Sequence, residues 1–245
     1  MSRIAFTKKI IIANWKENPK TAEEAISLAQ EIDSDGLVIA PPVAFLRDVG
    51  RNIKKASLGA QDMFWEEQGP FTGEVSGSQL KSLGVSYVII GHSDRRRLGE
   101  TDAMIAKKIS AALKDNLIPI LCVGETGEDR DAGRAAQIIE QEIKADLADV
   151  WEKSREIIIA YEPVWAIGSG IPDTPMNAIQ MSSLIRSLTV NQGLRARTIY
   201  GGSVTGENAK DFLQHNEVEG ALVGGASLQY NEIKKILEVA KLYGG

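Results

Sequence analysis

Eight short apolar runs recur along the chain, and a segment with helical spacing follows each of them. None of the runs alternates apolar with polar residues, so they predict strands that are buried on both faces, as in a parallel sheet. We expect these strands at residues 10–13, 37–40, 57–60, 87–90, 118–123, 157–160, 198–200 and 221–223.

The intervening segments carry helix signals. Thr21 and Glu24 have the spacing of a capping box, in which both side chains satisfy backbone N–H groups at the start of a helix. Apolar stripes at 25–32, 105–113 and 233–240 indicate helices with one buried face. Eight β-then-α units predict an α/β fold, a closed (β/α)8 barrel of eight parallel strands inside eight helices. The alternative, an open doubly wound sheet, favours a Gly-x-Gly-x-x-Gly turn after the first strand, where residues 14–16 read NWK.

The length and composition set further limits. A chain of 245 residues without a linker or low-complexity tract predicts a single barrel domain over residues 1–245. A net charge of −5 argues against non-specific nucleic-acid binding, and no apolar run approaches the roughly 20 residues that span a membrane. Residues 1–7 lack a secretory-signal pattern, and the lone Cys122 excludes an intramolecular disulfide. We therefore expect a cytoplasmic location.

Polar residues follow several predicted strands, at the barrel face where loops build active sites. Lys16 follows the first strand and could attract a phosphate, although an ordinary surface lysine fits too. His92 follows the fourth; a helical turn starting at Ser93 would favour a neutral ring, and a hydrogen-bonded core histidine is the alternative. Glu162 follows the sixth, where burial is costly, so it is a candidate general base or the partner of a barrel arginine.

The loops after the sixth, seventh and eighth strands are rich in glycine. The segment 163–172 is stiff at Pro163, carries glycines at 168 and 170, and suits a lid that excludes water from a ligand. Glycine pairs at 201–202 and 224–225 can expose backbone N–H groups, which bind phosphate together with a helix N-terminus. Two such pairs after consecutive late strands match the usual phosphate site of these barrels.

Motifs at these positions run in order along the chain: residues 14–16 (NWK), 87–93 (YVIIGHS), 160–168 (AYEPVWAIG), 200–204 (YGGSV) and 222–228 (LVGGASL). As a set they resemble those of the triosephosphate isomerase family. The resemblance implies interconversion of dihydroxyacetone phosphate and D-glyceraldehyde 3-phosphate through an enediolate, in glycolysis and gluconeogenesis. It also implies that no metal or organic cofactor is needed, and the sequence has no clustered His/Cys set to hold a metal.

The resemblance assigns roles residue by residue. Glu162 would move a proton between the two substrate carbons, and His92 would polarise the carbonyl and move protons between the oxygens. Lys16, with Asn14 beside it, would stabilise the enediolate oxygen. The phosphate would be held by backbone N–H groups and one hydroxyl, at Gly168, Gly224, Gly225 and Ser203.

The chain departs from the family pattern at Asp94, where glutamate is usual. In the family that carboxylate supports the lysine, so we expect the shorter side chain to have less reach toward Lys16. We predict an active enzyme whose turnover this shortening can lower. Ser93, next to Asp94, and Glu125, after the fifth strand, are expected to support the site from behind, Glu125 by steadying the lid hinge.

A long loop at residues 62–76 carries Trp65 and Phe71 next to Met63 and Phe64, which on a monomer would expose a large apolar patch. The resemblance, through residues 68–74 (QGPFTGE), implies that this loop inserts into a partner subunit with Thr72 near the partner's active site. We therefore expect a homodimer. A loop folded back on its own barrel, or a tetramer, is the alternative.

Two other functions remain open from the sequence. A different phosphosugar enzyme on the same barrel would explain the glycine pairs but not the lid motif or the pairing of His92 with Lys16. A catalytically silent, phosphate-binding barrel is supported only by Asp94, and the presence of Glu162 argues against it.

Overall fold

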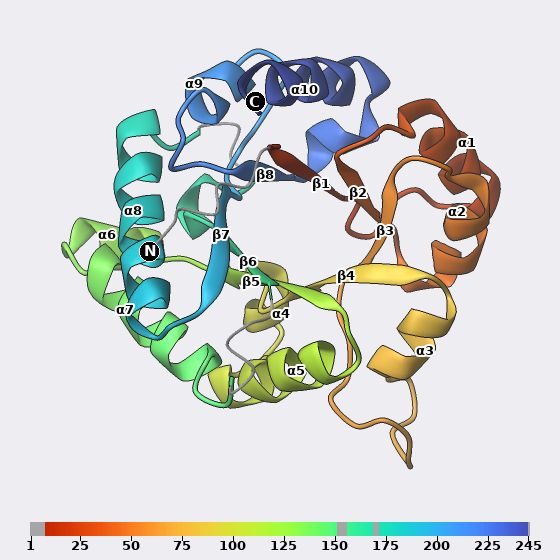
Figure 1. The fold of residues 1–245 in the computed structure, drawn as a ribbon, viewed down its shortest axis with the longest axis horizontal. Coiled ribbons are helices and arrows are strands. Elements are labelled where there is room, and N and C mark those ends of the chain that lie inside the picture. The colour runs from red at the N-terminus through yellow and green to blue at the C-terminus, as the bar shows by residue number, and fades with distance from the viewer. Residues whose placement is uncertain (1–7, 151–155, 169–171, 245) are drawn as a thin grey trace.

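A computed structural model describes residues 8–150, 156–168 and 172–244. Within these residues, eight parallel strands form a closed barrel in sequence order, and the last pairs with the first (Figure 1). The predicted barrel is confirmed, and the open doubly wound sheet is excluded. The strands are β1 (Ile10–Asn14), β2 (Leu37–Ala40), β3 (Ser57–Ala60), β4 (Val85–Ile90), β5 (Ile118–Val123), β6 (Glu156–Tyr161), β7 (Arg195–Tyr200) and β8 (Gly220–Val223).

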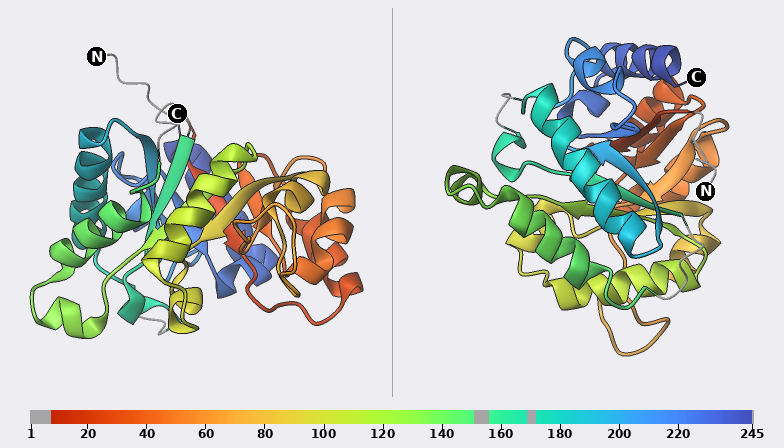
Figure 2. Two further views of the ribbon diagram at one scale, coloured as in Figure 1. Left: turned by 90° about the horizontal axis from the view of Figure 1, so that it is seen from below. Right: turned by 60° about the vertical axis from the view of Figure 1, so that its left-hand side comes forward.

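Helices surround the barrel, and short extra helices follow some of the strands. In the left view of Figure 2, the short green helix α6 projects from the lower edge of the barrel; it follows the carboxyl end of β5. The α-helices are α1 (Ala22–Ile32), α2 (Leu46–Asn52), α3 (Gly77–Ser82), α4 (Ser93–Arg97), α5 (Asp102–Lys114), α6 (Gly127–Asp131), α7 (Ala135–Asp146), α8 (Pro175–Asn191), α9 (Ala209–Leu213) and α10 (Tyr230–Tyr243), with 3-10 turns η1 (Val43–Phe45), η2 (Val164–Ala166) and η3 (Gly225–Leu228).

The apolar residues form two layers, which explains why the strands show no polar alternation. Along β1, Ile10 and Ile12 point into the barrel interior, where they pack with Ile120 and Ile158. The intervening Ile11 belongs to the larger layer between the strands and the helices. Each strand thus buries both faces, as expected for a parallel barrel.

The helix starts agree in part with the sequence signals. Thr21 caps α1 by accepting the N–H of Glu24, but the Glu24 carboxylate accepts the N–H of Lys20 rather than that of Thr21, so the predicted capping box is only half formed. A complete capping box, which we did not predict, opens α3 with Ser76 and Gln79. None of the helices in the described part of the chain combines the length and hydropathy of a membrane-crossing segment.

The loop at 62–76 lies between β3 and α3 and extends away from the barrel, beyond α3 in Figure 1. Its aromatic residues pack on one another: the Phe64 ring centroid lies 4.1 Å from that of Trp65 and 4.7 Å from that of Phe71. Of the four apolar side chains of the loop, Met63 is buried, Phe64 and Trp65 are partly buried, and only Phe71 is exposed, at 40%. The exposed apolar patch is therefore smaller than the sequence suggested, because the loop covers part of its own apolar surface.

Candidate active site

A cavity of about 360 Å³ opens at the carboxyl ends of the strands. It brings together side chains that the sequence spreads across the whole chain, as expected where parallel strands end at one face of a barrel. All the residues predicted to act on the substrate or to hold its phosphate line this cavity: Asn14, Lys16, His92, Glu162, Gly168, Ser203, Gly224 and Gly225.

Lys16 stands just beyond β1 in an unusual backbone conformation. Its φ of +52° lies in the left-handed region, which costs free energy for a residue with a side chain. Local hydrogen bonds hold it there: the Lys16 N–H donates to Asn14 Oδ1 at 3.1 Å, and Gln61 Nε2 donates to the carbonyls of Lys16 and Ala40. We missed Gln61 in the sequence, although its place directly after the third predicted strand is the signal that marked the other site residues.

The shorter carboxylate of Asp94, whose reach the sequence left open, does contact Lys16. Lys16 Nζ lies 2.9 Å from Asp94 Oδ2, and Arg97 contacts the other oxygen at 3.0 Å. Burial alone would raise the pKa of Asp94, but the hydrogen bond from Lys16 and the neighbouring positive charges outweigh it and lower this pKa. The ionised carboxylate therefore orients the lysine ammonium at the mouth of the cavity.

His92 is the N-cap residue of α4, as the predicted helical turn at Ser93 requires. Its Nδ1 accepts the backbone N–H of Asp94 at 3.0 Å, so this nitrogen carries no proton. A neutral ring held in this way carries its proton on Nε2, the nitrogen that faces the cavity floor and Glu162. The ring can thus donate a hydrogen bond to a substrate oxygen.

Glu162 follows β6 and is only 2% exposed. Its Oε2 accepts the N–H of Ser93 at 3.1 Å. Its Oε1 lies 3.1 Å from His92 Nε2 without hydrogen-bond geometry, and has no hydrogen-bond partner among the described residues. A Cβ built on Gly201 would lie 2.8 Å from Glu162 Cγ, so the first glycine after β7 makes room for this side chain. Among the described residues no arginine pairs with Glu162, so the alternative that this glutamate is the partner of a barrel arginine is not supported.

The opposite wall of the cavity is built from backbone. Gly224 and Gly225 precede and open the turn η3, whose first N–H groups lack partners within the turn. A Cβ built on Gly225 would meet no described atom within 4 Å, and one on Gly224 would meet only Lys16 Cε, at 3.8 Å. This wall therefore offers open backbone to an anion, with Ser203 beside it.

A buried polar network anchors the start of the lid. Glu125 is fully buried, and its Oε1 accepts hydrogen bonds from Trp165 Nε1 and from the Tyr161 hydroxyl, both at 3.1 Å. Arg130 bridges Glu125 and Asp173 and stacks over the Trp165 ring. We expected Glu125 to steady the hinge, but we missed Tyr161, Arg130 and Asp173, which carry no local motif.

Further along the lid, Gly168 is exposed and has a φ of +68°, a conformation that suits glycine. Gly170, the other lid glycine that we singled out, lies outside the described residues, as do residues 1–7.

The loop at 62–76 does not contribute to the cavity of its own barrel. Trp65, Thr72 and Phe71 are absent from its lining, and Thr72 and Phe71 are exposed. A second cavity of about 630 Å³ lies between this loop and α4, and Lys16, His92 and Asp94 form part of its wall.

The rim of this second cavity includes Val43 and Leu98, which are 59% and 79% exposed. Apolar side chains this exposed next to functional residues are typical of a surface that another molecule covers. Within the described residues, no group of three or more His, Cys, Asp or Glu side chains is arranged to hold a metal ion.

The chain is similar to proteins of one family over nearly its whole length. A family model described as triosephosphate isomerase matches residues 9–240. The triosephosphate isomerase of Aquifex aeolicus is 43% identical over 244 residues, covering 94% of this chain and 98% of the relative. Those of Dictyoglomus thermophilum and Caldanaerobacter subterraneus subsp. tengcongensis are 43% and 41% identical, covering 91% and 94% of this chain and 95% and 98% of the relatives.

Proposed function

Because the chain belongs to the triosephosphate isomerase family, it is an enzyme that isomerises triose phosphates, and we propose how its strand-end residues carry out the reaction. The reaction interconverts dihydroxyacetone phosphate and D-glyceraldehyde 3-phosphate, a step of glycolysis and gluconeogenesis. It moves one proton between neighbouring carbons and one between neighbouring oxygens, with no net change in composition. The chain therefore has to supply a base for carbon and a proton donor for oxygen.

Glu162 is the base for carbon. Its carboxylate removes a proton from one substrate carbon, and the carboxylic acid that results returns a proton to the neighbouring carbon. Support comes from its burial and from Oε1, which has no hydrogen-bond partner among the described residues. The Ser93 N–H donates to the other oxygen, so we infer that a bound substrate has to compete with this hydrogen bond for the carboxylate.

His92 is the proton donor for oxygen. The N–H of Asp94 occupies its Nδ1, which leaves Nε2–H to polarise the substrate carbonyl and to exchange protons with the enediolate oxygens. Lys16 and Asn14 stabilise the negative charge of the enediolate from the other side of the cavity. The observation that carries the proposal is the 3.1 Å approach of Glu162 Oε1 to His92 Nε2 at the floor of a cavity that also holds a lysine and two glycine pairs.

The phosphate group binds at the backbone wall of the cavity. Gly224, Gly225 and Ser203 hold it, and Gly168 adds a further N–H when the lid covers the substrate. We propose no metal or organic cofactor, because proton transfer by Glu162 and His92 accounts for every bond that changes.

We further propose a homodimer in which the loop at 62–76 of each subunit enters the second cavity of its partner. Thr72, which is exposed in the loop, and the exposed Val43 and Leu98 at the cavity rim support this arrangement. Light scattering at micromolar concentration should give twice the 26.6 kDa of one chain, and a species of 26.6 kDa alone would contradict the proposal. A cytoplasmic location is proposed from the single cysteine, Cys122, which is buried.

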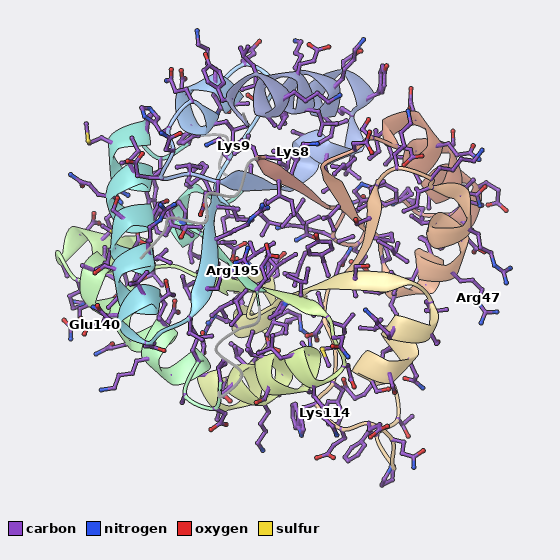
Figure 3. All side chains as sticks on the ribbon, viewed as in Figure 1. Lys8, Lys9, Arg47, Lys114, Glu140 and Arg195 are labelled. Carbon is purple, nitrogen blue, oxygen red and sulfur yellow. The ribbon has the colours of Figure 1, made fainter. Side chains whose placement is uncertain are left out.

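The decisive experiment measures steady-state conversion of D-glyceraldehyde 3-phosphate in the presence of a metal chelator. We expect Glu162→Gln to lower kcat by about 10²-fold to 10⁴-fold, because the amide cannot accept the carbon proton. Glu140→Gln is the matched control: Glu140 is an exposed glutamate on α7 and points away from the barrel (Figure 3).

Equal turnover by the native chain and Glu162→Gln would refute the role of Glu162. Folded protein that binds a phosphorylated enediolate analogue without any turnover would favour the silent phosphate-binding barrel. Turnover only of larger phosphosugars would instead indicate a different enzyme on the same barrel.

A further inference from the structure

Behind Glu162 lies a chain of contacts that the proposed mechanism does not use. Gly124 directly follows β5 and lies beside Glu162, which directly follows the neighbouring strand β6. The Glu162 N–H donates to the Val123 carbonyl at 2.8 Å, which fixes the two strand ends to each other. The backbones are packed so tightly that a Cβ built on Gly124 would lie 1.6 Å from the Glu162 carbonyl oxygen. The position of the Gly124 peptide therefore determines where the Glu162 backbone can lie.

The Gly124 peptide is itself held from outside the barrel. Its N–H points to α7, where Glu142 Oε2 accepts it at 2.8 Å. Glu142 is partly buried in the middle of α7, and its side chain is only 16% exposed. Removing this acceptor would leave the part-buried Gly124 N–H unpaired, which destabilises the folded chain. The loop would therefore shift to find another acceptor.

A guanidinium group keeps the Glu142 carboxyl in place. Arg96 Nη1 lies 3.7 Å from Glu142 Oε1 and 2.6 Å from Asp102, and Nη2 lies 2.6 Å from Asp146. The same guanidinium donates to the carbonyls of Gly91 and Cys122, which lie at the ends of β4 and β5. The cluster thus connects α5 and α7 to the ends of β4 and β5, which carry His92 and Gly124.

We propose that Glu142 is a positioning residue for the isomerase: by accepting the Gly124 N–H it fixes the peptide against which the Glu162 backbone packs. The proposal rests on Glu162 being the base. Because the phosphate wall lies at the ends of β7 and β8, on other strands, loss of this hydrogen bond should affect proton transfer more than substrate binding.

The role needs an acceptor oxygen rather than a negative charge. Burial raises the pKa of Glu142 to about 7, so that near neutral pH a large share of the molecules carry the neutral carboxyl, whose carbonyl oxygen still accepts the Gly124 N–H. A glutamine amide has the same shape and the same acceptor, and therefore should replace this side chain.

The test compares kcat and KM for D-glyceraldehyde 3-phosphate among four chains, each assayed well below its melting temperature. Glu142→Ala should lower kcat by about tenfold or more with KM changed less than about threefold, because small displacements of a reacting group cost large factors in rate. Glu142→Gln should restore kcat to within about threefold of the native value. Asp146→Asn is the matched control, because it disturbs the same Arg96 cluster without contacting Gly124.

Three results would overturn the proposal: native kcat in Glu142→Ala, a loss in Glu142→Gln as large as in Glu142→Ala, or an equal loss in Asp146→Asn. If Glu142→Ala does not fold, Glu142→Asp keeps a carboxyl group next to Arg96 but shortens the side chain by one methylene, which draws its oxygens away from Gly124. It should show the same selective loss of kcat, and native kcat there would also overturn the proposal. Failure of the proposed function has a different signature, namely a Glu162→Gln variant as active as the native chain.

Discussion

Replacing Gly124 with alanine should displace Glu162, the proposed base, while leaving the proposed phosphate site intact. The added Cβ would lie 1.6 Å from the Glu162 carbonyl oxygen, 2.5 Å from the carbonyl carbon and 3.2 Å from the Cα atom. Because non-bonded heavy atoms need about 3.5 Å, the closest of these contacts requires the two backbones to separate by about 2 Å, which moves each by about 1 Å when they share it equally. All three atoms are backbone, so no side-chain rotation can relieve the contact.

The displacement sets the expected effect. A misplacement of about 1 Å can lower the rate by about 10²-fold, and forcing an extra methyl group into a packed site costs about 1–3 kcal/mol of stability. We therefore expect Gly124→Ala to fold with a lowered melting temperature and to lose about 10²-fold in kcat, with KM nearly unchanged. Steady-state kinetics and a thermal melt measure both effects.

Gly127→Ala is the matched control, since it lies three residues along the same loop. A Cβ built there would meet only Trp165 Cβ among the described atoms, at an ordinary 3.6 Å, and Gly127 is the first residue of α6, where alanine favours the helix. Gly127→Ala should keep native kcat. If Gly124→Ala keeps native kcat as well, the backbone contact does not position Glu162, and the reasoning fails.

Three other predictions concern the Lys16 partner, the buried acids and a helix cap. Asp94→Glu should change kcat/KM by less than about threefold, because Asp94 already reaches Lys16 at 2.9 Å; a larger gain would show that the short side chain limits the enzyme. Burial raises the pKa of Glu142 to about 7 and that of Asp146 to about 8, so the folded chain retains protons that the unfolded chain releases. The free energy of unfolding should therefore fall as pH rises from about 4 to about 8, by at most about 1.4 kcal/mol per pH unit for each proton; urea titrations should show a flatter profile for Asp146→Asn, and a flat native profile would contradict this. Thr174 caps α8 by accepting the Asn177 N–H at 3.2 Å, so Thr174→Ala should cost about 1 kcal/mol and lower Tm by about 2–4 °C in calorimetry, whereas Thr174→Ser should not.

The barrel could be predicted because its strands are buried on both faces, which leaves continuous apolar runs in the sequence. The same criterion missed the start of β7, where two arginines interrupt the apolar pattern: Arg195 is exposed, and Arg197 is largely buried and pairs with Glu156 at 3.3 Å. It also missed α6, a short polar helix (GEDRD) without an apolar stripe, which begins at a cap where Thr126 accepts the Asp129 N–H.

The side chains that line the cavity could be predicted for a related reason. Each of them lies at the end of a strand or within a few residues after it, and the ends of parallel strands meet at one face of the barrel. Glu142 could not be found in this way, because it lies in the middle of α7 and reaches Gly124 only after that helix packs against the barrel. The reach of Asp94 toward Lys16 was left open by the sequence, because it depends on how closely α4 approaches the loop after β1.

The pairing of β1 with β8 has a consequence for protein synthesis. Lys16, next to the first strand, and Gly224, next to the last, form neighbouring parts of one cavity, with a separation of 3.8 Å between Lys16 Cε and a Cβ built on Gly224. A nascent chain on the ribosome therefore has no phosphate site until its eighth strand has emerged and docked. Joining segments so distant in sequence carries a loop-closure entropy that shorter-range pairings do not. Isomerase activity during translation should thus appear abruptly when the barrel closes, and should not increase gradually with the length of the nascent chain.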